Sequence, residues 1–331
     1  TRRRSFRLSP EIRHSVNRGF KFLLRRQAAT NSFQSEPYPV AMNALVGLAH
    51  LAGGTTPLEG KDPDSVRSVR LCLQTLLKMQ EKSGVFSGHQ SRSMYGHGFA
   101  TLFLAQVYGT SGELDRKVRD ALRRAIRVIE ASQRKEGGWD YSPDPGAIPG
   151  GQNASDTSIT VCQTMALRAA NNLGFNVDKT VIRRARRYIQ KMQKDDGSFR
   201  YRTGMEFLEA IAGRSAFPRS AAGVCILYSL GEYSTSHIRK GLAYLESNYE
   251  YYQEAFPFYG QYYCSQALFQ VGGRRWNKYY KYISRRLLTD QNSDGAWRAH
   301  AKQLEIFPPQ TTAMALIVLQ LPYRYLPIHE R

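Results

Sequence analysis

The sequence predicts an all-α protein in which six helical hairpins close into an (α/α)6 toroid with inner and outer helix rings. Three observations favour this fold. A seven-residue pattern recurs along the 331-residue chain, strand patterns are nearly absent, and each repeat pairs an amphipathic helix with a helix that is apolar almost all round. A helix that is apolar all round must be buried, so we expect the second helix of each hairpin in the inner ring.

The recurring pattern begins with a glutamine, continues through a short polar turn and reaches an aromatic residue six positions later. Its four clear copies are Gln80 to Phe86, Gln133 to Trp139, Gln193 to Phe199 and Gln291 to Trp297. A degenerate copy runs from Gln27 to Phe33, with Asn31 in place of the glycine. The glutamine can satisfy free carbonyls at the end of its own outer helix and donors at the start of the next helix, with the ring stacked over it. We therefore interpret these residues as structural braces.

The first two hairpins have clear start and stop signals. The first spans about residues 11–52, where Pro10 suits the start of its outer helix and Gly53 ends its inner helix. The second spans about residues 63–108, and we place the start of its inner helix near Gly98. Its outer helix has an apolar stripe at helical spacing: Val66, Val69, Leu73, Leu76 and Leu77.

The third and fourth hairpins span about residues 114–173 and 178–231. Their outer helices carry apolar stripes at Val118, Leu122, Ala125 and Ile129, and at Val181, Ala185, Tyr188, Ile189 and Met192. In the third hairpin a loop rich in glycine and proline, from Tyr141 to Asn153, separates the two helices. A loop of that length on a compact scaffold is more often functional than a short one.

The last two hairpins, about 236–272 and 276–320, depart further from the pattern. The turn of the fifth has lost its glutamine and become a tyrosine-rich run, Tyr249 to Tyr252, and we place the start of its inner helix near Gly260. The sixth inner helix follows Phe307 and two prolines. We expect the tail after residue 321 to be extended.

Composition and charge limit the classes of partner. The formal net charge is +20, from 47 Lys and Arg against 27 Asp and Glu. Much of this excess lies on the outer helices around residues 116–127 and 179–187, which indicates solvated outer faces. We therefore expect no nucleic-acid partner, while an anionic membrane surface or an acidic glycan stays open. Uninterrupted apolar runs are too short to predict a membrane span.

The four cysteines lie far apart in apolar helical segments: Cys72, Cys162, Cys225 and Cys264. They predict buried free thiols rather than a disulfide framework or a structural zinc site, which weakly favours a reducing compartment. The chain starts at Thr1 rather than a methionine, which is compatible with a leader removed before it. The compartment, cytoplasmic or exported, and the oligomeric state are left open by the sequence.

The repeat resembles that of the squalene and oxidosqualene cyclases, whose scaffold the protein prenyltransferase β subunits share. The best copy is Tyr188-Ile-Gln-Lys-Met-Gln-Lys-Asp-Asp-Gly-Ser-Phe199, and the resemblance covers essentially the whole chain. It implies the α/α toroid with inner and outer helix rings. It is weak for function, because this scaffold supports several activities.

The catalytic motifs of these families are incomplete in this chain. Squalene-type cyclases use Asp-x-Asp-Asp-Thr, whose middle aspartate protonates an alkene or epoxide, and the nearest match here is Asn153-Ala-Ser-Asp-Thr157. Ser155 stands at the donor position, so Asp156 is a weak catalytic candidate and a better helix N-cap.

Prenyltransferases hold zinc with an Asp two residues before a Cys, where this chain has Tyr262 and Cys264, and with a later His. The sixth inner helix has no histidine and His300 lies earlier, so we expect no metal and no cofactor. The Gly-Cys-Gly-Glu-Gln motif of complement-type thioester domains, which share the scaffold, does not occur.

His97 lies between two glycines near the start of an inner helix, and two interpretations stay open. It is a weak candidate for a general acid or base, and it is equally a packed polar residue. The starts of the inner helices should line the mouth of a central cavity. Candidate cavity or ligand-binding residues there are Tyr95, Arg219, Tyr259, Tyr262, Tyr263 and Gln310.

These observations favour a cyclase- or prenyltransferase-like repeat protein whose apolar cavity binds or transforms an isoprenoid or another elongated lipid. Two alternatives stay open, and whether the chain is an enzyme is undecided. A polysaccharide-lyase-like enzyme acting on an acidic glycan requires basic side chains inside the cleft. A non-catalytic protein-binding scaffold is favoured if side chains fill the cavity.

Overall fold

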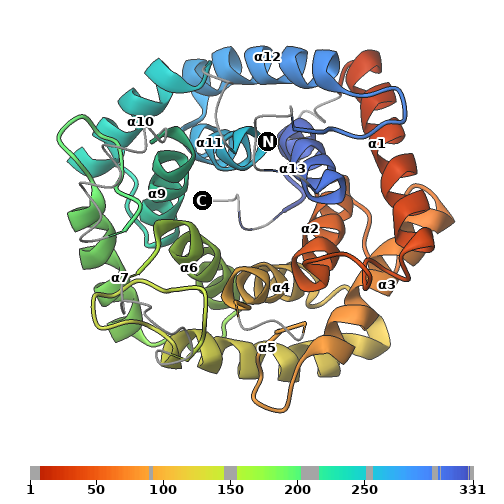
Figure 1. Cartoon of the computed structure of the whole chain (residues 1–331), viewed down its shortest axis with the longest axis horizontal. Helices are drawn as coiled ribbons and strands as arrows, with labels where there is room; N and C mark the ends of the chain where they lie inside the picture. The colour runs from red at the N-terminus through yellow and green to blue at the C-terminus, as the bar shows by residue number, and fades with distance from the viewer. Residues whose placement is uncertain are drawn as a thin grey trace, which may run out of the picture.

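The computed structural model describes residues 8–88, 92–144, 155–202, 216–250, 256–299, 305, 307–326 and 328. This part of the chain contains twelve α-helices and two 3₁₀-helices, and the extended pairing within it is limited to isolated bridges. The helices form two concentric rings (Figure 1). The predicted (α/α)6 toroid is confirmed.

Each hairpin contributes its first helix to the outer ring and its second to the inner ring, as predicted. The outer helices are α1 (Pro10–Ala29), α3 (Pro63–Met79), α5 (Asp115–Ala131), α7 (Lys179–Met192), α10 (Ser236–Asn248) and α12 (Gly273–Asp290). The inner helices are α2 (Pro39–Ala52), α4 (Met94–Val107), α6 (Thr157–Asn172), α9 (Phe217–Ser229), α11 (Pro257–Val271) and α13 (Pro308–Gln320). The short 3₁₀-helices are η1 (Gly112–Leu114) and η2 (Leu321–Tyr323).

Burial follows the sequence pattern in both rings. All the stripe residues of α5 and α7 are buried, while every residue of α2 and nearly every residue of α13 is buried. Each fully buried leucine, isoleucine or valine contributes roughly 1.5–3 kcal/mol relative to exposure. The inner ring is therefore the core of the molecule, and the outer helices cover it with one face each.

Two inner helices start earlier than the sequence predicted. The sequence predicts helix starts near Gly98 and Gly260, but α4 begins at Met94 and α11 at Pro257. These glycines mark close contacts between inner helices instead. A Cβ at Gly98 would lie 2.6 Å from the Cβ of Cys162, and one at Gly260 would lie 3.0 Å from the ring of Phe217.

The glutamine turns connect neighbouring outer helices. Each glutamine Nε2 donates to the carbonyl of its turn glycine and to a carbonyl of the next outer helix. The second acceptors, each at 2.9 Å, are Ala121 for Gln80, Val181 for Gln133, His237 for Gln193 and Ser15 for Gln291. The last of these joins the sixth hairpin to the first, and α13 packs against both α1 and α2, so the ring is closed.

The two tryptophans of the turns have a role that the sequence analysis assigned to the glutamines. The indole nitrogens of Trp139 and Trp297 donate to the carbonyls of Ile129 and Leu287, near the ends of α5 and α12. In these two turns a free carbonyl near the end of the outer helix is thus bonded by the indole of its own turn. The glutamine side chain donates instead to carbonyls in the turn and in the next outer helix.

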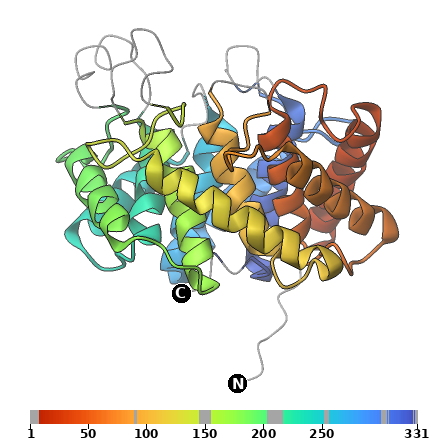
Figure 2. The same ribbon diagram turned by 90° about the horizontal axis from the view of Figure 1, so that it is seen from below.

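The last described residues pack against the ends of the inner helices. The tail was predicted to be extended, but its first residues form η2, and Arg324 then adopts a left-handed conformation with φ of 60°. Leu326 and Ile328 are buried, and the backbone N–H of Ile328 donates to the side chain of Gln106 in α4. Figure 2 shows the toroid from the side, with the outer helices crossing in front of the inner ones. None of the described helices has both the length and the hydropathy of a membrane span.

Candidate functional site

Aromatic side chains meet on the axis of the toroid. Helices α4 and α11 stand on opposite sides of the inner ring of helices (Figure 1), yet their aromatic side chains approach one another. The ring centroids of Phe99 and Tyr262 are 6.3 Å apart, and those of Tyr95 and Tyr259 are 6.5 Å apart. The predicted tyrosines therefore lie on the axis, but at this level they span it rather than line an open channel.

The tyrosines of α11 form a cluster with an unusual polar feature. Tyr263 packs edge-on against both Tyr259 and Tyr262 with centroids 4.8 Å apart, and its hydroxyl lies 3.5 Å from the sulfur of Cys162. Burial raises the pKa of all three phenols, so they are neutral hydroxyl groups. The hydroxyl of Tyr259 is buried and has no hydrogen-bond partner among the described residues.

Asp156 caps the N-terminus of α6. Its Oδ1 accepts hydrogen bonds from the backbone N–H and the hydroxyl of Ser158, at 2.7 and 2.5 Å. Its Oδ2 lies 3.4 Å from Nε of Arg202. Burial raises the pKa of Asp156, and the bonds from Ser158 and Tyr201 and the charge of Arg202 oppose that shift. The Oγ of Ser155 is buried without a partner among the described residues.

Four residues that the sequence analysis did not select surround Asp156. The guanidinium of Arg202 pairs with Asp140 as well as Asp156, and it stands over the rings of Tyr141 and Tyr201, at 5.6 and 5.8 Å from their centroids. The two tyrosine hydroxyls are 3.0 Å apart. The repeat could have predicted these two tyrosines, because Tyr141 and Tyr201 each lie two positions after the aromatic residue of a turn. We call these five residues the mouth cluster: Asp140, Tyr141, Asp156, Tyr201 and Arg202.

A fifth residue that the sequence analysis missed is Glu305. Its carboxylate accepts the backbone N–H groups of Phe258 at 2.8 Å and Tyr259 at 2.6 Å, in the first turn of α11. Burial raises the pKa of Glu305 to about 8, although these two backbone hydrogen bonds favour the charged form. Helix α11 has no side-chain cap of its own, so a distant carboxylate satisfies its free donors.

His97 has the geometry of a packed polar residue. Its Nδ1 accepts the backbone N–H of Phe86 at 3.1 Å, and its Nε2 lies 3.2 Å from the carbonyl of Ala125. In other repeats the backbone N–H of the turn aromatic donates to a hydroxyl group of an inner helix instead. Trp139 donates to Thr160, Phe199 to Ser220 and Trp297 to Thr312. Burial lowers the pKa of His97 to about 4, so the ring is neutral near pH 7. These contacts support the structural interpretation of His97 over the acid–base one.

The remaining candidates lie at the same end of the ring. Arg219, in the first turn of α9, donates from its Nε to the carbonyl of Phe199 at 2.7 Å and so supports a turn. Gln310 is half-buried in the first turn of α13. All four cysteines are buried free thiols. Within the described residues, no three His, Cys, Asp or Glu side chains are grouped to hold a metal ion. His300 and Asn153 lie outside those residues.

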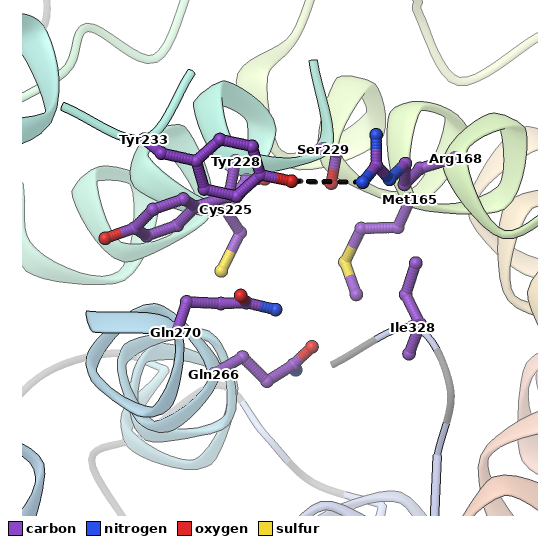
Figure 3. Close-up of a pocket in the computed structure, with 9 residues that line it drawn as sticks. All are labelled: Met165, Arg168, Cys225, Tyr228, Ser229, Tyr233, Gln266, Gln270 and Ile328. Atoms are coloured by element: carbon purple, nitrogen blue, oxygen red, sulfur yellow. Dashed lines mark hydrogen bonds between the residues drawn. The ribbon is translucent and has the colours of Figure 1, made fainter. Parts of the chain in front are cut away.

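A small pocket lies near the opposite end of the inner ring (Figure 3). It encloses about 30 Å³ between α6, α9 and α11, which is room for roughly one water molecule. Arg168 donates to the hydroxyl of Tyr233 at 3.0 Å on one side, and Ile328 of the tail lies on another. The tail thus contributes to packing at this end, and the pocket is too small for an organic ligand. We therefore take the mouth cluster and the aromatic axis as the candidate site.

Comparisons with known proteins agree with this architecture. Residues 58–207 match the family model of the squalene-hopene cyclase C-terminal domain. A type II terpene cyclase, MstE from Scytonema, superposes with a TM-score of 0.61 at 12% identity, over 96% of this chain and 98% of that one. Residues 58–207 thus resemble the C-terminal domain of the squalene-hopene cyclases, and the chain shares the toroid fold of type II terpene cyclases. The matched segment of this cyclase-like protein contains all five residues of the mouth cluster.

Two other solved structures have the same fold. A protein from Actinoplanes superposes on the cyclase-like chain with a TM-score of 0.64 at 14% identity, covering 93% of this chain and 98% of that one. An inactive variant of an α-1,6-mannanase from Salegentibacter superposes with a TM-score of 0.59 at 7% identity, covering 94% of this chain and 99% of that one. At these identities the likeness shows the fold alone. No curated protein sequence matches the chain.

Proposed function

We propose that this cyclase-like protein binds an isoprenoid or another elongated lipid along its aromatic axis, with the polar end of the ligand at the mouth cluster. The observation that carries the proposal is the buried, unpartnered hydroxyl of Tyr259 among aromatic rings. Leaving a buried hydroxyl unsatisfied costs roughly 1–3 kcal/mol, so such groups usually have a partner in the functional state. The polar group of a ligand supplies that partner.

The rings that meet on the axis are a modest obstacle to such a ligand. Aromatic pairs at these separations are worth about 0.5–1.5 kcal/mol each beyond their buried area. A lipid gains about 0.8 kcal/mol for each methylene that it buries. A chain that buries five methylenes therefore gains roughly 4 kcal/mol, which exceeds the loss of the two ring contacts across the axis.

The proposal does not include the proton transfer that starts cyclisation in type II cyclases. Ser155 stands at the position of the proton donor, and a hydroxyl group is far too weak an acid to protonate an alkene. Asp156 accepts from Ser158 on one oxygen and faces Arg202 with the other. Both of its oxygens therefore act as acceptors, which supports a cap and a brace rather than a proton donor.

A specific observation favours a second candidate function, a non-catalytic protein-binding scaffold. The ring contacts across the axis are those expected if side chains fill the cavity. The acidic-glycan alternative has less support, because the arginine-rich helices α5 and α7 belong to the outer ring and do not line the centre of the toroid. The mannanase is a neighbour in fold, and its sugar ligand enters the experiment below as a comparison.

Equilibrium binding distinguishes these candidates. The purified chain is titrated with geranylgeranyl dihydroxybenzoate, the substrate bound in an MstE structure, with geranylgeraniol, and with α-1,6-mannotetrose, while tryptophan fluorescence is followed. We expect saturable binding of the two prenyl compounds, and mass spectrometry should recover both unchanged. A cyclised product would contradict the inference that this protein does not protonate its ligand. Absence of prenyl binding would reject the lipid proposal and leave the scaffold.

A further inference from the structure

A basic groove lies between α5 and the link from α6 to α7, beside Tyr108 at the end of α4. It holds about 540 Å³, which is within the range of ligand-binding clefts. One wall is formed by α5 and carries Arg119, Arg123 and Arg127. The other wall includes Leu173 and Phe175. The groove is remote in the fold from the aromatic axis, and the function proposed above makes no use of it.

The three arginines are spaced four residues apart and so share one face of α5. Successive arginines are separated by about 6 Å along the helix axis. Arg119 and Arg123 have one carboxylate between them, that of Asp120, at 3.8 and 3.9 Å, beyond hydrogen-bond distance. In the described part of the chain no carboxylate forms an ion pair with Arg127. The wall therefore presents three cations with little local compensation.

The rest of the groove is largely apolar. Tyr108 and Phe175 pack edge-to-face with centroids 5.6 Å apart, and Leu173 is 38% exposed beside them. Glu130 stands at the end of the arginine row, and its carboxylate accepts the backbone N–H of Asp178 at 2.8 Å. That acid is thus held against the start of α7. The groove combines a row of positive charge with an apolar wall that has no cover among the described residues.

We propose that this groove binds an acidic peptide segment, with carboxylates along one side and an apolar side chain between them. Alternate side chains of an extended peptide are about 6.6 Å apart, close to the spacing of the arginines. Arginine forms two-pronged hydrogen bonds with carboxylates, and Leu173 and Phe175 offer a surface for the apolar side chain. A concave groove favours a narrow ligand over a flat membrane surface.

The test measures fluorescence anisotropy of a labelled ten-residue peptide in which Glu alternates with Ser and one central Ser is replaced by Phe. The double variant Arg123→Glu/Arg127→Glu should weaken binding at least about tenfold, since charge-assisted hydrogen bonds are lost. The matched control is Arg116→Glu/Lys117→Glu, two exposed positions on the same helix that do not line the groove. It makes the same change in net charge and should weaken binding less than about threefold, by long-range electrostatics alone.

Circular dichroism and thermal melts establish that both double variants are folded before binding is compared. A peptide with Gln in place of Glu should bind much more weakly than the acidic one. The proposal is overturned if the acidic peptide does not bind, or if the control variant loses as much affinity as the groove variant. It is also overturned if oligothymidylate or phosphatidylserine vesicles bind more tightly than the peptide and depend on the same two arginines.

Discussion

The hydroxyl groups of Tyr141 and Tyr201 lie 3.0 Å apart, although sixty residues separate them in the chain. Both follow the aromatic residue of a turn by two positions, so the repeat places them side by side in successive hairpins. The hydroxyl of Tyr201 is also hydrogen-bonded to Asp156, and the guanidinium of Arg202 lies over both tyrosine rings. A sequence feature that serves the scaffold thus also builds a polar cluster at one end of the axis.

Arg202 should be important for stability as well as for the mouth cluster. Arg202→Met leaves Asp140 and Asp156 without their cation, and both carboxylates are buried. Removing one partner of a buried ion pair is strongly destabilising, so we expect a loss of about 3 kcal/mol in the free energy of unfolding. Urea denaturation measures it. Arg183→Met, at an exposed position of α7, should change stability by less than about 0.5 kcal/mol. Similar losses in the two variants would show that Arg202 does not hold the cluster together.

His97 should make stability depend on pH in the acidic range. Its pKa is about 4 in the folded protein and about 6.5 in an unfolded chain, so between these values the unfolded state binds more protons. The stabilising effect is complete above pH 6.5 and is lost as the pH falls toward 4. The stability difference between the wild type and His97→Asn should therefore shrink by about 3 kcal/mol between pH 7 and pH 4. Urea denaturation at several pH values measures this difference. A difference that stays constant over that interval would mean that His97 is not buried in its neutral form.

Gln291 should hold the first and last hairpins together. Its side chain donates to the carbonyl of Ser15 and accepts from the Ser15 hydroxyl, both at 2.9 Å. Gln291→Ala removes these bonds and should lower the free energy of unfolding by about 1–3 kcal/mol. It should also speed hydrogen exchange in α1. Gln133→Ala, the same change in an internal repeat, should speed exchange in α7 instead. If exchange in α1 is the same in both variants, the glutamine does not contribute to ring closure.

Gly98 should tolerate no side chain, because α4 and α6 are in close contact there. A Cβ at this position would lie 2.6 Å from the Cβ of Cys162. Gly98→Ala should destabilise the protein by about 1–3 kcal/mol, the range for overpacked cores. Adding Cys162→Gly removes the opposing Cβ. The double variant should recover stability relative to the sum of the single changes in a double-mutant cycle of thermal or urea unfolding. Simple additivity would indicate that the two helices do not meet at these residues.

Hydrophobic periodicity was sufficient to predict the fold and the division into outer and inner helices. The stripes of α5 and α7 are buried at every predicted position, because each of these helices packs through one face on the inner helices of its own hairpin and of the preceding one. The N-cap role of Asp156 was also predictable, since capping depends on residues within one turn of the chain. These features are local or repeat along the chain.

The candidate site was less predictable, because its contacts cross the ring. Periodicity indicates that Tyr262 is buried, but not that it meets Phe99 on the opposite helix. Glu305 lies in no repeat pattern, and it caps a helix that starts 48 residues earlier in the chain. Gly98 and Gly260 suggest helix boundaries in the sequence although they lie within α4 and α11, since close packing between helices and a break in a helix both favour glycine.

The most direct test of lipid binding on the aromatic axis compares two single-hydroxyl deletions. Tyr259→Phe removes the unpartnered hydroxyl on the axis, and Tyr249→Phe removes a hydroxyl at the end of outer helix α10, beside Lys278. The measurement is the dissociation constant of geranylgeranyl dihydroxybenzoate for each variant and the wild type. We predict about fivefold weaker binding for Tyr259→Phe, as for one neutral hydrogen bond of about 1 kcal/mol, and no change for Tyr249→Phe. Equal dissociation constants for the two variants, or no binding by the wild type, would contradict the proposal.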